Sequence, residues 1–240
     1  MSLKTTFIYA GIAGHGFESL RQGMEAGWIS HGLARLSASV KANGFNTDLI
    51  DLRALSNWAH FREVLAERDP DVVGVTMMSV DYNPASRAIA IAKEVKPELI
   101  TVIGGPHVTI ALEDALRIPH VDYLVTREGE VTFPHLLRLI EGGDPPPHRV
   151  HRGEPPDLDA IPFADRDLFL DEWKRWGYDL KSPEVPFVPE LPPPFATVIA
   201  GRGCVYNCAF CKPGEDFLFG KRTRRRGVNN VVAELQDLVE

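Results

Sequence analysis

The sequence of 240 residues contains no hydrophobic run that approaches the roughly 20 residues needed to cross a bilayer. Its N-terminus also lacks the organisation of a signal peptide, so we expect a cytoplasmic protein without a membrane partner. An excess of basic residues is absent too, because the formal net charge is −7. This charge argues against nucleic acid as the main partner. The single basic run, residues 221–226, is expected to be solvated or to face an anion.

Cysteine is scarce, and its three copies are confined to one short segment, at Cys204, Cys208 and Cys211. An odd number of cysteines without a secretory segment argues against a disulfide and indicates a reducing compartment. Structural cysteines would be scattered through a core, whereas thiolates in one loop can converge on a metal centre. Their spacing is C-x3-C-x2-C, with the aromatic residue Phe210 directly before the last cysteine.

Histidine is absent after His151, so no imidazole lies close to the cysteines in the sequence. Three thiolates and one histidine would form a tetrahedral zinc site. Such a site would have to recruit its histidine from a distant part of the chain. A 4Fe-4S cluster held by three thiolates needs no histidine and leaves one iron open for another ligand. The sequence therefore favours the cluster, with zinc as the alternative.

Short apolar runs alternate with amphipathic segments over the first 140 residues, which predicts five βα units. Strands are expected at 6–10, 47–52, 72–78, 99–103 and 121–125, and helices around 29–40, 83–96 and 132–140. Asn83, followed by Pro84, is the expected cap of the second of these helices. The fold class is α/β, with a doubly wound parallel sheet of the flavodoxin or Rossmann type. Its ligands should bind at the carboxyl ends of the strands.

Proline changes the character of the chain between residues 141 and 194, which hold 12 of its 19 prolines. Because proline removes a backbone donor and fixes φ, we expect a semi-rigid linker with little regular structure here. A buried strand at 195–200, the cysteine loop and a helix capped by Asn229 or Asn230 should follow, with Val232 and Leu235 on the apolar face of that helix. The expected domains are residues 1–141, the linker 142–194 and the start of a second domain at 195–240.

Two ligand classes fit the predicted sheet poorly. A phospho-receiver needs an aspartate after the third strand, where this chain has Thr76 and two methionines. A nicotinamide site would use Gly11, Gly14 and Gly16, but their spacing is G-x-x-G-x-G. The acidic residue Asp51 lies 35 residues after Gly16, further than the usual distance of about 20 residues.

The cysteine motif resembles the signature of the radical S-adenosylmethionine (SAM) enzymes, in which SAM chelates the open iron of a 4Fe-4S cluster. The turns Gly104-Gly105-Pro106-His107 and Arg127-Glu128-Gly129-Glu130 resemble those of the cobalamin-binding domains fused to such enzymes. The same resemblance extends to four further segments, at 32–36, 70–76, 158–163 and 230–234. It therefore covers essentially the whole chain. The chain is thus similar to the cobalamin-dependent radical SAM proteins.

The resemblance implies that cofactors contact the loops after the strands. The implied cofactor-binding residues are Gly11, Gly14, His15, Met78, Ser79, Gly104, Gly105, His107, Glu128, Gly129 and Glu130, with Phe210 at the adenine of SAM and Cys204, Cys208 and Cys211 at the cluster. Adjacent glycines let a bulky ligand approach the backbone, although they would equally serve a tight exit from a strand. Since the motif D-x-H-x-x-G is absent, we expect base-off cobalamin without an axial histidine.

The implied activity is reductive cleavage of SAM to methionine and a 5′-deoxyadenosyl radical, with methyl transfer from cobalamin to a small-molecule or natural-product substrate. An electron donor such as flavodoxin or ferredoxin is the implied protein partner. The cofactors carry this chemistry, so no catalytic side chain is assigned. A tRNA methylthiotransferase would need additional cysteines in its N-terminal domain, and none precedes Cys204.

The length of the C-terminal part limits what is expected of it. A (β/α)8 barrel takes about 250 residues, whereas 29 residues follow Cys211. We therefore expect an incomplete radical SAM barrel, with cobalamin binding but without efficient cleavage of SAM. The alternative is a stand-alone cobalamin-binding module whose cysteines hold a non-catalytic iron-sulfur or zinc site.

Overall fold

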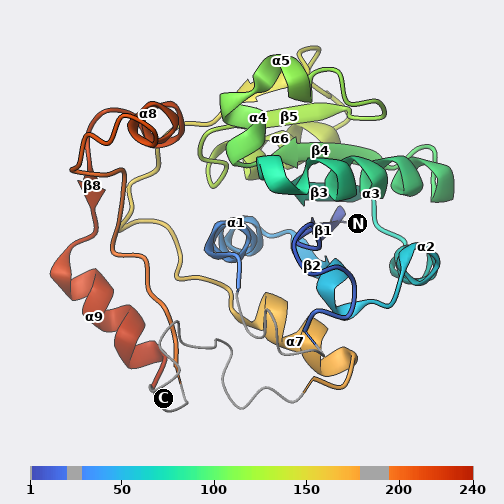
Figure 1. Ribbon diagram of the computed structural model, residues 1–240, viewed down its shortest axis with the longest axis horizontal. Helices are drawn as coiled ribbons and strands as arrows, with labels where there is room; N and C mark the ends of the chain where they lie inside the picture. The colour runs from blue at the N-terminus through green and yellow to red at the C-terminus, as the bar shows by residue number, and fades with distance from the viewer. Residues whose placement is uncertain (1, 21–28, 179–194, 240) are drawn as a thin grey trace.

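A computed structural model of the chain describes residues 2–20, 29–178 and 195–239. Its central element is a parallel sheet of six strands in the order β2-β1-β3-β4-β5-β6 (Figure 1). The strands are β1 (Lys4–Tyr9), β2 (Asn46–Asp51), β3 (Val72–Thr76), β4 (Ile100–Gly104), β5 (Tyr123–Thr126) and β6 (Val150–Arg152). The predicted flavodoxin-like sheet is confirmed, and its order places the topological switch point between β1 and β3.

Helices cover both faces of the sheet. On one face lie α1 (His31–Ala42), α6 (Thr132–Glu141) and α7 (Asp167–Arg175); on the other lie α2 (Trp58–Arg68), α3 (Tyr82–Val95), α4 (Pro106–Ile110) and α5 (Leu112–Ala115). Successive strand side chains point to opposite faces, so Phe7 belongs to the first core and its neighbour Ile8 to the second. Both side chains are fully buried.

Two helices differ from the sequence expectations, one in its existence and one in its cap. The sequence patterns above do not predict α2, although Asn57 caps it by accepting from two backbone N–H groups and Phe61 and Leu65 share its buried face. The prediction that Asn83 caps α3 is wrong, because the helix begins at Tyr82. Pro84 then falls in the first turn, where the missing N–H has no intrahelical partner to lose.

The expectation of little regular structure in the linker is wrong for residues 142–178, which form β6 and α7. No proline lies between Pro162 and residue 178, so a helix can form there. Trp173 of α7 is buried, and its indole N–H donates to the carboxylate of Asp51 at 2.9 Å. β6 is an edge strand, which tolerates the prolines around it. Residues 179–194, with Pro192–194, lie outside the described residues.

Residues 195–239, called the C-terminal segment below, lie on the α1 side of the sheet, opposite α2 (Figure 1). A short antiparallel ribbon of β7 (Gly201–Arg202) and β8 (Arg224–Arg225) surrounds the cysteine loop and α8 (Lys212–Phe219), and α9 (Val228–Asp237) follows. The predicted buried strand at 195–200 is wrong, because these residues adopt neither strand nor helix. They have no described strand to pair with, and Ile199 is 41% exposed.

The expected cap of the last helix is also wrong, and part of its predicted apolar face is exposed. Gly227 caps α9, while the Asn230 amide accepts a hydrogen bond from Arg226 and donates one to the Asp159 carbonyl. Val232 and Leu235 are exposed, and the side chain that points inward is Glu234. Charged groups are therefore the fully buried contacts of this helix.

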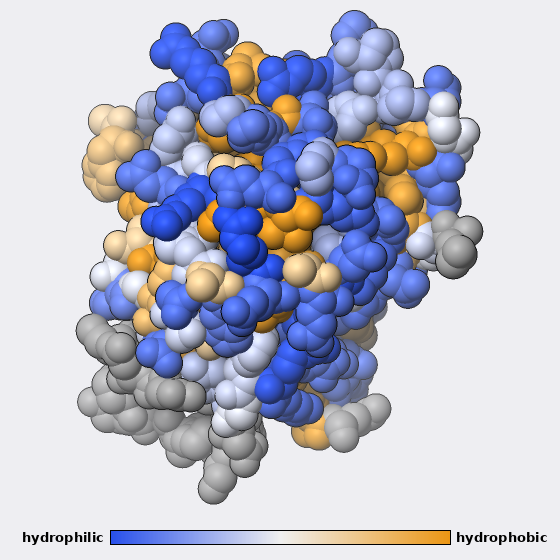
Figure 2. All heavy atoms as spheres, turned by 90° about the vertical axis from the view of Figure 1, so that its right-hand side faces the viewer, coloured by the Kyte–Doolittle hydropathy of each residue, from blue (hydrophilic) through white to orange (hydrophobic). Residues whose placement is uncertain are grey.

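The face of the molecule that carries α2 and α3 is largely polar (Figure 2). Figure 2 views the molecule from the side on which α2 and α3 lie in Figure 1, and hydrophilic side chains dominate this face, with apolar ones in separate patches. None of the described helices is long and apolar enough to span a membrane.

Candidate functional site

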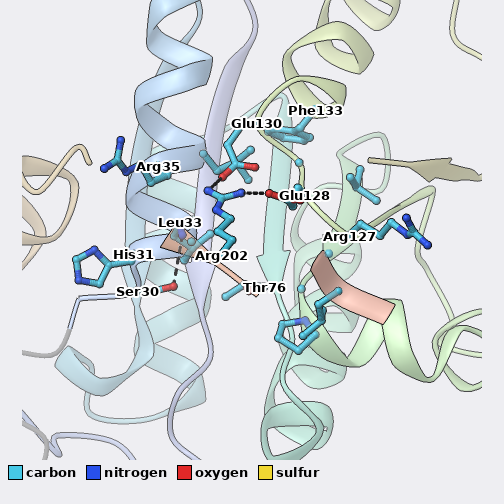
Figure 3. Close-up of a pocket in the computed structure, with 18 of the residues that line it drawn as sticks. Ser30, His31, Leu33, Arg35, Thr76, Arg127, Glu128, Glu130, Phe133 and Arg202 are labelled. Carbon is cyan, nitrogen blue, oxygen red and sulfur yellow. Dashed lines mark hydrogen bonds and ion pairs between the residues drawn. The ribbon is translucent and has the colours of Figure 1, made fainter. Parts of the chain in front are cut away.

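A cavity of about 640 Å³ lies at the carboxyl end of the sheet. Its floor is formed by the ends of β1, β3, β4 and β5, and its walls by α1 and the turn after β5 (Figure 3). β7 and α8 of the C-terminal segment complete it. The cavity therefore spans the predicted edge of the sheet and includes the switch point, where doubly wound domains bind their ligands.

The deep part of the cavity is an apolar slot along the sheet. Its lining includes Phe7, Val102 and Val125 from the strands and Phe133 from α6. Gly74 lies among them, and a Cβ there would come within 2.8 Å of the Phe7 ring. Glycine at this position therefore leaves space for the Phe7 ring, so it need not serve a ligand. The resulting slot, bounded by aromatic and aliphatic groups, suits a flat apolar group of a ligand.

The adjacent glycines after β4 have a structural explanation. Gly105 has φ of +102°, and a Cβ there would lie 2.9 Å from the backbone N and O of Met77. A Cβ on Gly104 would lie 3.2 Å from the carbonyl of Val125. Both residues line the cavity, but the tight strand exit alone accounts for glycine at these positions. Close approach by a ligand stays a prediction.

The predicted cofactor-binding glutamates line the cavity, but their carboxylates form ion pairs with arginines of the C-terminal segment. Glu128 and Glu130 are 4% and 7% exposed. Arg202 donates to both carboxylates, one from each terminal nitrogen (Figure 3). Arg224 also donates to Glu128. Between the glutamates, Gly129 also lines the cavity. This turn therefore contacts both the cavity and the segment that carries the cysteines.

The basic run faces protein carboxylates at alternate positions. Arg224 and Arg226 point inward while Arg225 is exposed, as expected where β8 alternates its side chains. Arg226 binds Glu234, whose carboxylate is also bound by Arg35 of α1 at 2.8 Å. The predicted anion-facing segment is confirmed for these two arginines, since the anions are carboxylates of the chain itself.

Glu234 is the centre of a buried ionic cluster. Arg35, Arg166 and Arg226 all donate to this carboxylate, which is 1% exposed. Burial raises the pKa of Glu234, but the hydrogen bond from Arg226 and the charge of Arg35 outweigh it and hold the pKa below its usual value. The carboxylate therefore stays ionised and links α9 to α1.

Several predicted cofactor residues are not among the residues that line the cavity. These are Gly11, Gly14, His15, Ser79 and His107, whereas Met78 does line it. His107 is buried, with Nδ1 3.0 Å from the Ser79 hydroxyl and Nε2 3.3 Å from the Asp114 carboxylate. Its imidazole is thus surrounded by groups of the protein. Contact of these five residues with a ligand stays a prediction.

The cysteine loop directly follows a residue that lines the cavity. Gly203 lines the cavity, and Cys204, which follows it, is half-buried, whereas Cys208 and Cys211 are exposed free thiols. Lys212 donates from Nζ to the Cys204 carbonyl at 3.0 Å and Cys211 N donates to the Cys208 carbonyl at 3.1 Å, which closes the loop. Phe210 is 92% exposed, so its contact with the adenine of SAM stays a prediction.

The three thiols of this loop are candidate ligands of a metal centre. A zinc site needs its donors within about 2.3 Å of one point. Within the described ranges, no three His, Cys, Asp or Glu side chains are grouped to hold one ion. Thiolates are ligands of zinc and of iron-sulfur clusters alike, so the choice of a cluster for this loop stays a prediction.

His31, at the first turn of α1, is a cavity residue that the sequence patterns do not identify. Its Nε2 is 2.5 Å from the Thr197 hydroxyl of the C-terminal segment. Burial, together with the positive charge of Arg166, lowers the pKa of His31 from 6.5 to about 4. The imidazole is therefore neutral near pH 7. Its proximity to the 195–200 segment depends on tertiary structure and leaves no local signal in the sequence.

The lowered pKa of His31 predicts a loss of stability in acid. Between pH 6.5 and about 4 the unfolded chain protonates this imidazole while the folded chain does not, so stability falls as the pH falls through that window. Urea unfolding at pH 7 and pH 5 measures the effect. His31→Gln should show a smaller loss than the wild type, and the exposed control His135→Gln should show the wild-type loss. An unchanged loss in His31→Gln would refute the assignment.

The comparisons with known proteins agree with this site. Residues 24–137 match the B12-binding domain family, and the chain carries this domain. The chain is similar in sequence to methyltransferases, among them a cobalamin-dependent radical SAM methyltransferase. The family resemblance stated from the sequence is therefore confirmed.

Individual relatives show how far this likeness extends. The chain is 32% identical over 224 residues to an uncharacterised methyltransferase of Pyrococcus horikoshii, covering 86% of this chain and 45% of that protein. It is 31% identical over 235 residues to the anaerobic magnesium-protoporphyrin IX monomethyl ester cyclase of Rubrivivax gelatinosus, covering 89% and 39%. The chain thus spans less than half the length of these relatives.

A solved structure shares the fold. The cobalamin-dependent SAM radical enzyme OxsB, with aqua-cobalamin and SAM bound, superimposes with a TM-score of 0.70 at 16% identity. The match covers 98% of this chain and 31% of OxsB. At this identity the likeness concerns the fold, which extends from the B12-binding domain into the C-terminal segment.

Proposed function

We propose that this chain binds cobalamin in the cavity and a 4Fe-4S cluster on Cys204, Cys208 and Cys211, as part of a cobalamin-dependent radical SAM enzyme that methylates a small molecule. The observation that carries the proposal is the position of the cavity. It lies at the switch point of a B12-binding domain and is closed by the segment that bears the three thiols. One ligand site and one cluster-binding loop are thereby neighbours.

The apolar slot favours the base-off form of cobalamin. A nucleotide base released from cobalt is flat and aromatic, and Phe7, Val125 and Phe133 offer it a dry surface. Among the described lining residues the only histidine is His31, and its Nε2 is already engaged with Thr197. An axial imidazole is therefore not expected from this cavity.

The side chains of this chain orient and enclose the cofactors. Bound cobalamin supplies a transferable methyl group, and SAM on the cluster supplies the radical chemistry. Leu36 and Phe133 line the cavity with apolar groups, and Arg202 lines it next to the cysteine loop. A small-molecule substrate and a flavodoxin or ferredoxin as electron donor belong to the same proposal.

The test is anaerobic reconstitution with iron and sulfide, followed by titration with hydroxocobalamin and SAM. We expect stoichiometric cobalamin with a base-off spectrum, iron and sulfide bound through the thiols, and a change in the cluster spectrum when SAM is added. Cobalamin binding without a SAM-induced change would support the alternative of a carrier module with a non-catalytic site. No cobalamin binding would contradict the proposal.

The absence of an axial histidine is checked by substitution. His15→Ala, His107→Ala and His31→Gln should each leave the spectrum of bound cobalamin unchanged, because none of these imidazoles is expected to coordinate cobalt. The apolar-slot variant Phe133→Ala is the positive control, since it should weaken binding. Loss of an imidazole-type spectrum in any single histidine variant would refute the base-off proposal.

A further inference from the structure

Arg202 joins the cysteine loop to the turn after β5. It lies on β7, two residues before Cys204, and its side chain is 13% exposed. One terminal nitrogen donates to Glu128 and the other to Glu130, whose side chains are 3% and 6% exposed. A planar guanidinium can bridge two carboxylates in this way, whereas a lysine ammonium offers only a point charge.

These contacts form a linear chain of ion pairs without net formal charge. Arg224 binds the second oxygen of Glu128, so two arginines meet two glutamates in the order Glu130, Arg202, Glu128 and Arg224. Hydrogen bonds and charges from Glu130 and Glu128 outweigh the effect of burial and raise the pKa of Arg202 above its usual value. Charge-assisted bonds in a buried place are strong and directional, so they fix a geometry.

The turn held by Arg202 is also a wall of the cavity. Gly129, between the two glutamates, lines the cavity, and a Cβ there would contact Leu36 of α1 at 3.4 Å. A movement of Arg202 would thus displace both the cavity wall and the start of the cysteine loop. Gly203, with φ of +81°, is the only residue between Arg202 and Cys204.

We propose that Arg202 is a positioning residue that holds the cysteine loop at the mouth of the cavity, so that a cluster and a cobalamin face each other at a fixed distance. The second half of this inference rests on the proposed function. The first half concerns the apo chain alone. The two halves are tested by separate measurements.

The apo measurement follows the reactivity of one thiol. In the background Cys208→Ala/Cys211→Ala, half-buried Cys204 is the single cysteine, and its rate of reaction with Ellman's reagent reports how firmly the loop is held. Arg202→Gln should raise this rate at least tenfold, and Arg202→Lys should give an intermediate rate. The matched control is Arg225→Gln, on the exposed side of the paired strand, which should react like the background. An unchanged rate in Arg202→Gln would overturn the proposal.

A second variant guards against misfolding. Arg202→Gln leaves Glu130 buried without its partner, whereas Glu130→Gln/Arg202→Gln removes both charges and keeps Glu128 paired with Arg224. The double variant should fold, as judged by circular dichroism and its thermal midpoint, and should still expose Cys204. A folded double variant with wild-type reactivity would overturn the proposal even if the single variant fails to fold.

The holo measurement uses the magnetic coupling between reduced cluster and cob(II)alamin, which weakens steeply with distance. In the reconstituted wild type, electron paramagnetic resonance should show a coupled pair with one defined interaction. Arg202→Gln should bind both cofactors but show weakened or heterogeneous coupling, and Arg225→Gln should match the wild type. Unchanged coupling in Arg202→Gln would overturn the fixed-distance claim. If the wild type binds neither cofactor, the proposed function fails, while the thiol rates still decide the role of Arg202.

Discussion

Replacement of Glu234 by alanine is expected to release α9 from the rest of the molecule. This carboxylate is shared by Arg35, Arg166 and Arg226, all within a buried cluster. Removing one partner of a buried ion pair costs about 3–5 kcal/mol, because the remaining charge is left uncompensated. With Val232 and Leu235 exposed, α9 has little apolar packing in the described structure to offset that loss.

Hydrogen exchange of the α9 amides is the measurement, because it reports local opening separately from global unfolding. Protection should fall by at least about a hundredfold in Glu234→Ala, in keeping with a local loss of this size. Glu234→Gln, which keeps the hydrogen-bond acceptor but not the charge, should lie between. The control is Asp237→Ala, an exposed acid on the same helix, which should exchange like the wild type. Wild-type protection in Glu234→Ala would contradict the assigned role of the cluster.

The lowered pKa of Glu234 also fixes how docking depends on pH. Its contribution is present above the usual value of 4.5 and is lost as the pH falls through the lower pKa of the folded state. His31 acts in a higher window, between about 4 and 6.5. Acid should therefore weaken the C-terminal segment in two steps, the first of which His31→Gln removes.

The parallel sheet could be predicted because its signals are local. Residues 72–76 form a continuous apolar run, as expected for a strand covered on both faces, and β3 indeed lies inside the sheet. β6 and α7 could not be predicted from proline content, because composition averaged over a linker hides a proline-free stretch between residues 163 and 178. The segment 195–200 shows the reverse error. Its apolar run is typical of a strand, but a strand needs a neighbour, and sequence periodicity does not show whether one exists.

The candidate site could be predicted at the level of motifs but not of contacts. Residues 104–106 and 127–130 do line the cavity, since both turns follow strands of one parallel sheet. That Glu128 and Glu130 bind Arg202 could not be predicted, because the partners are more than 70 residues apart in the sequence. The contacts of His31 and Arg35 could not be predicted for the same reason. Their roles depend on where the C-terminal segment docks.

Substitution of Gly105 by alanine is expected to destabilise the whole sheet domain. Gly105 has φ of +102° and ψ of −174°, a conformation that essentially only glycine adopts. A Cβ there would lie 2.9 Å from both backbone N and backbone O of Met77. Those atoms bond the Gly104 carbonyl and the His107 N–H at 2.9 and 3.0 Å, so the clash would break the junction of β3 and β4.

Strain and overpacking together predict a loss of about 2–6 kcal/mol in the free energy of unfolding, measured with urea. Gly32→Ala is the matched control, because Gly32 also lines the cavity but sits in α1, where a Cβ has only an ordinary contact of 3.9 Å with the Ser30 hydroxyl. It should leave stability unchanged or raise it by up to about 1 kcal/mol, since alanine is the better helix former. Wild-type stability in Gly105→Ala would contradict the explanation that the tight strand exit requires glycine here. Loss of stability would instead mean that the fold itself requires this turn at the wall of the cavity.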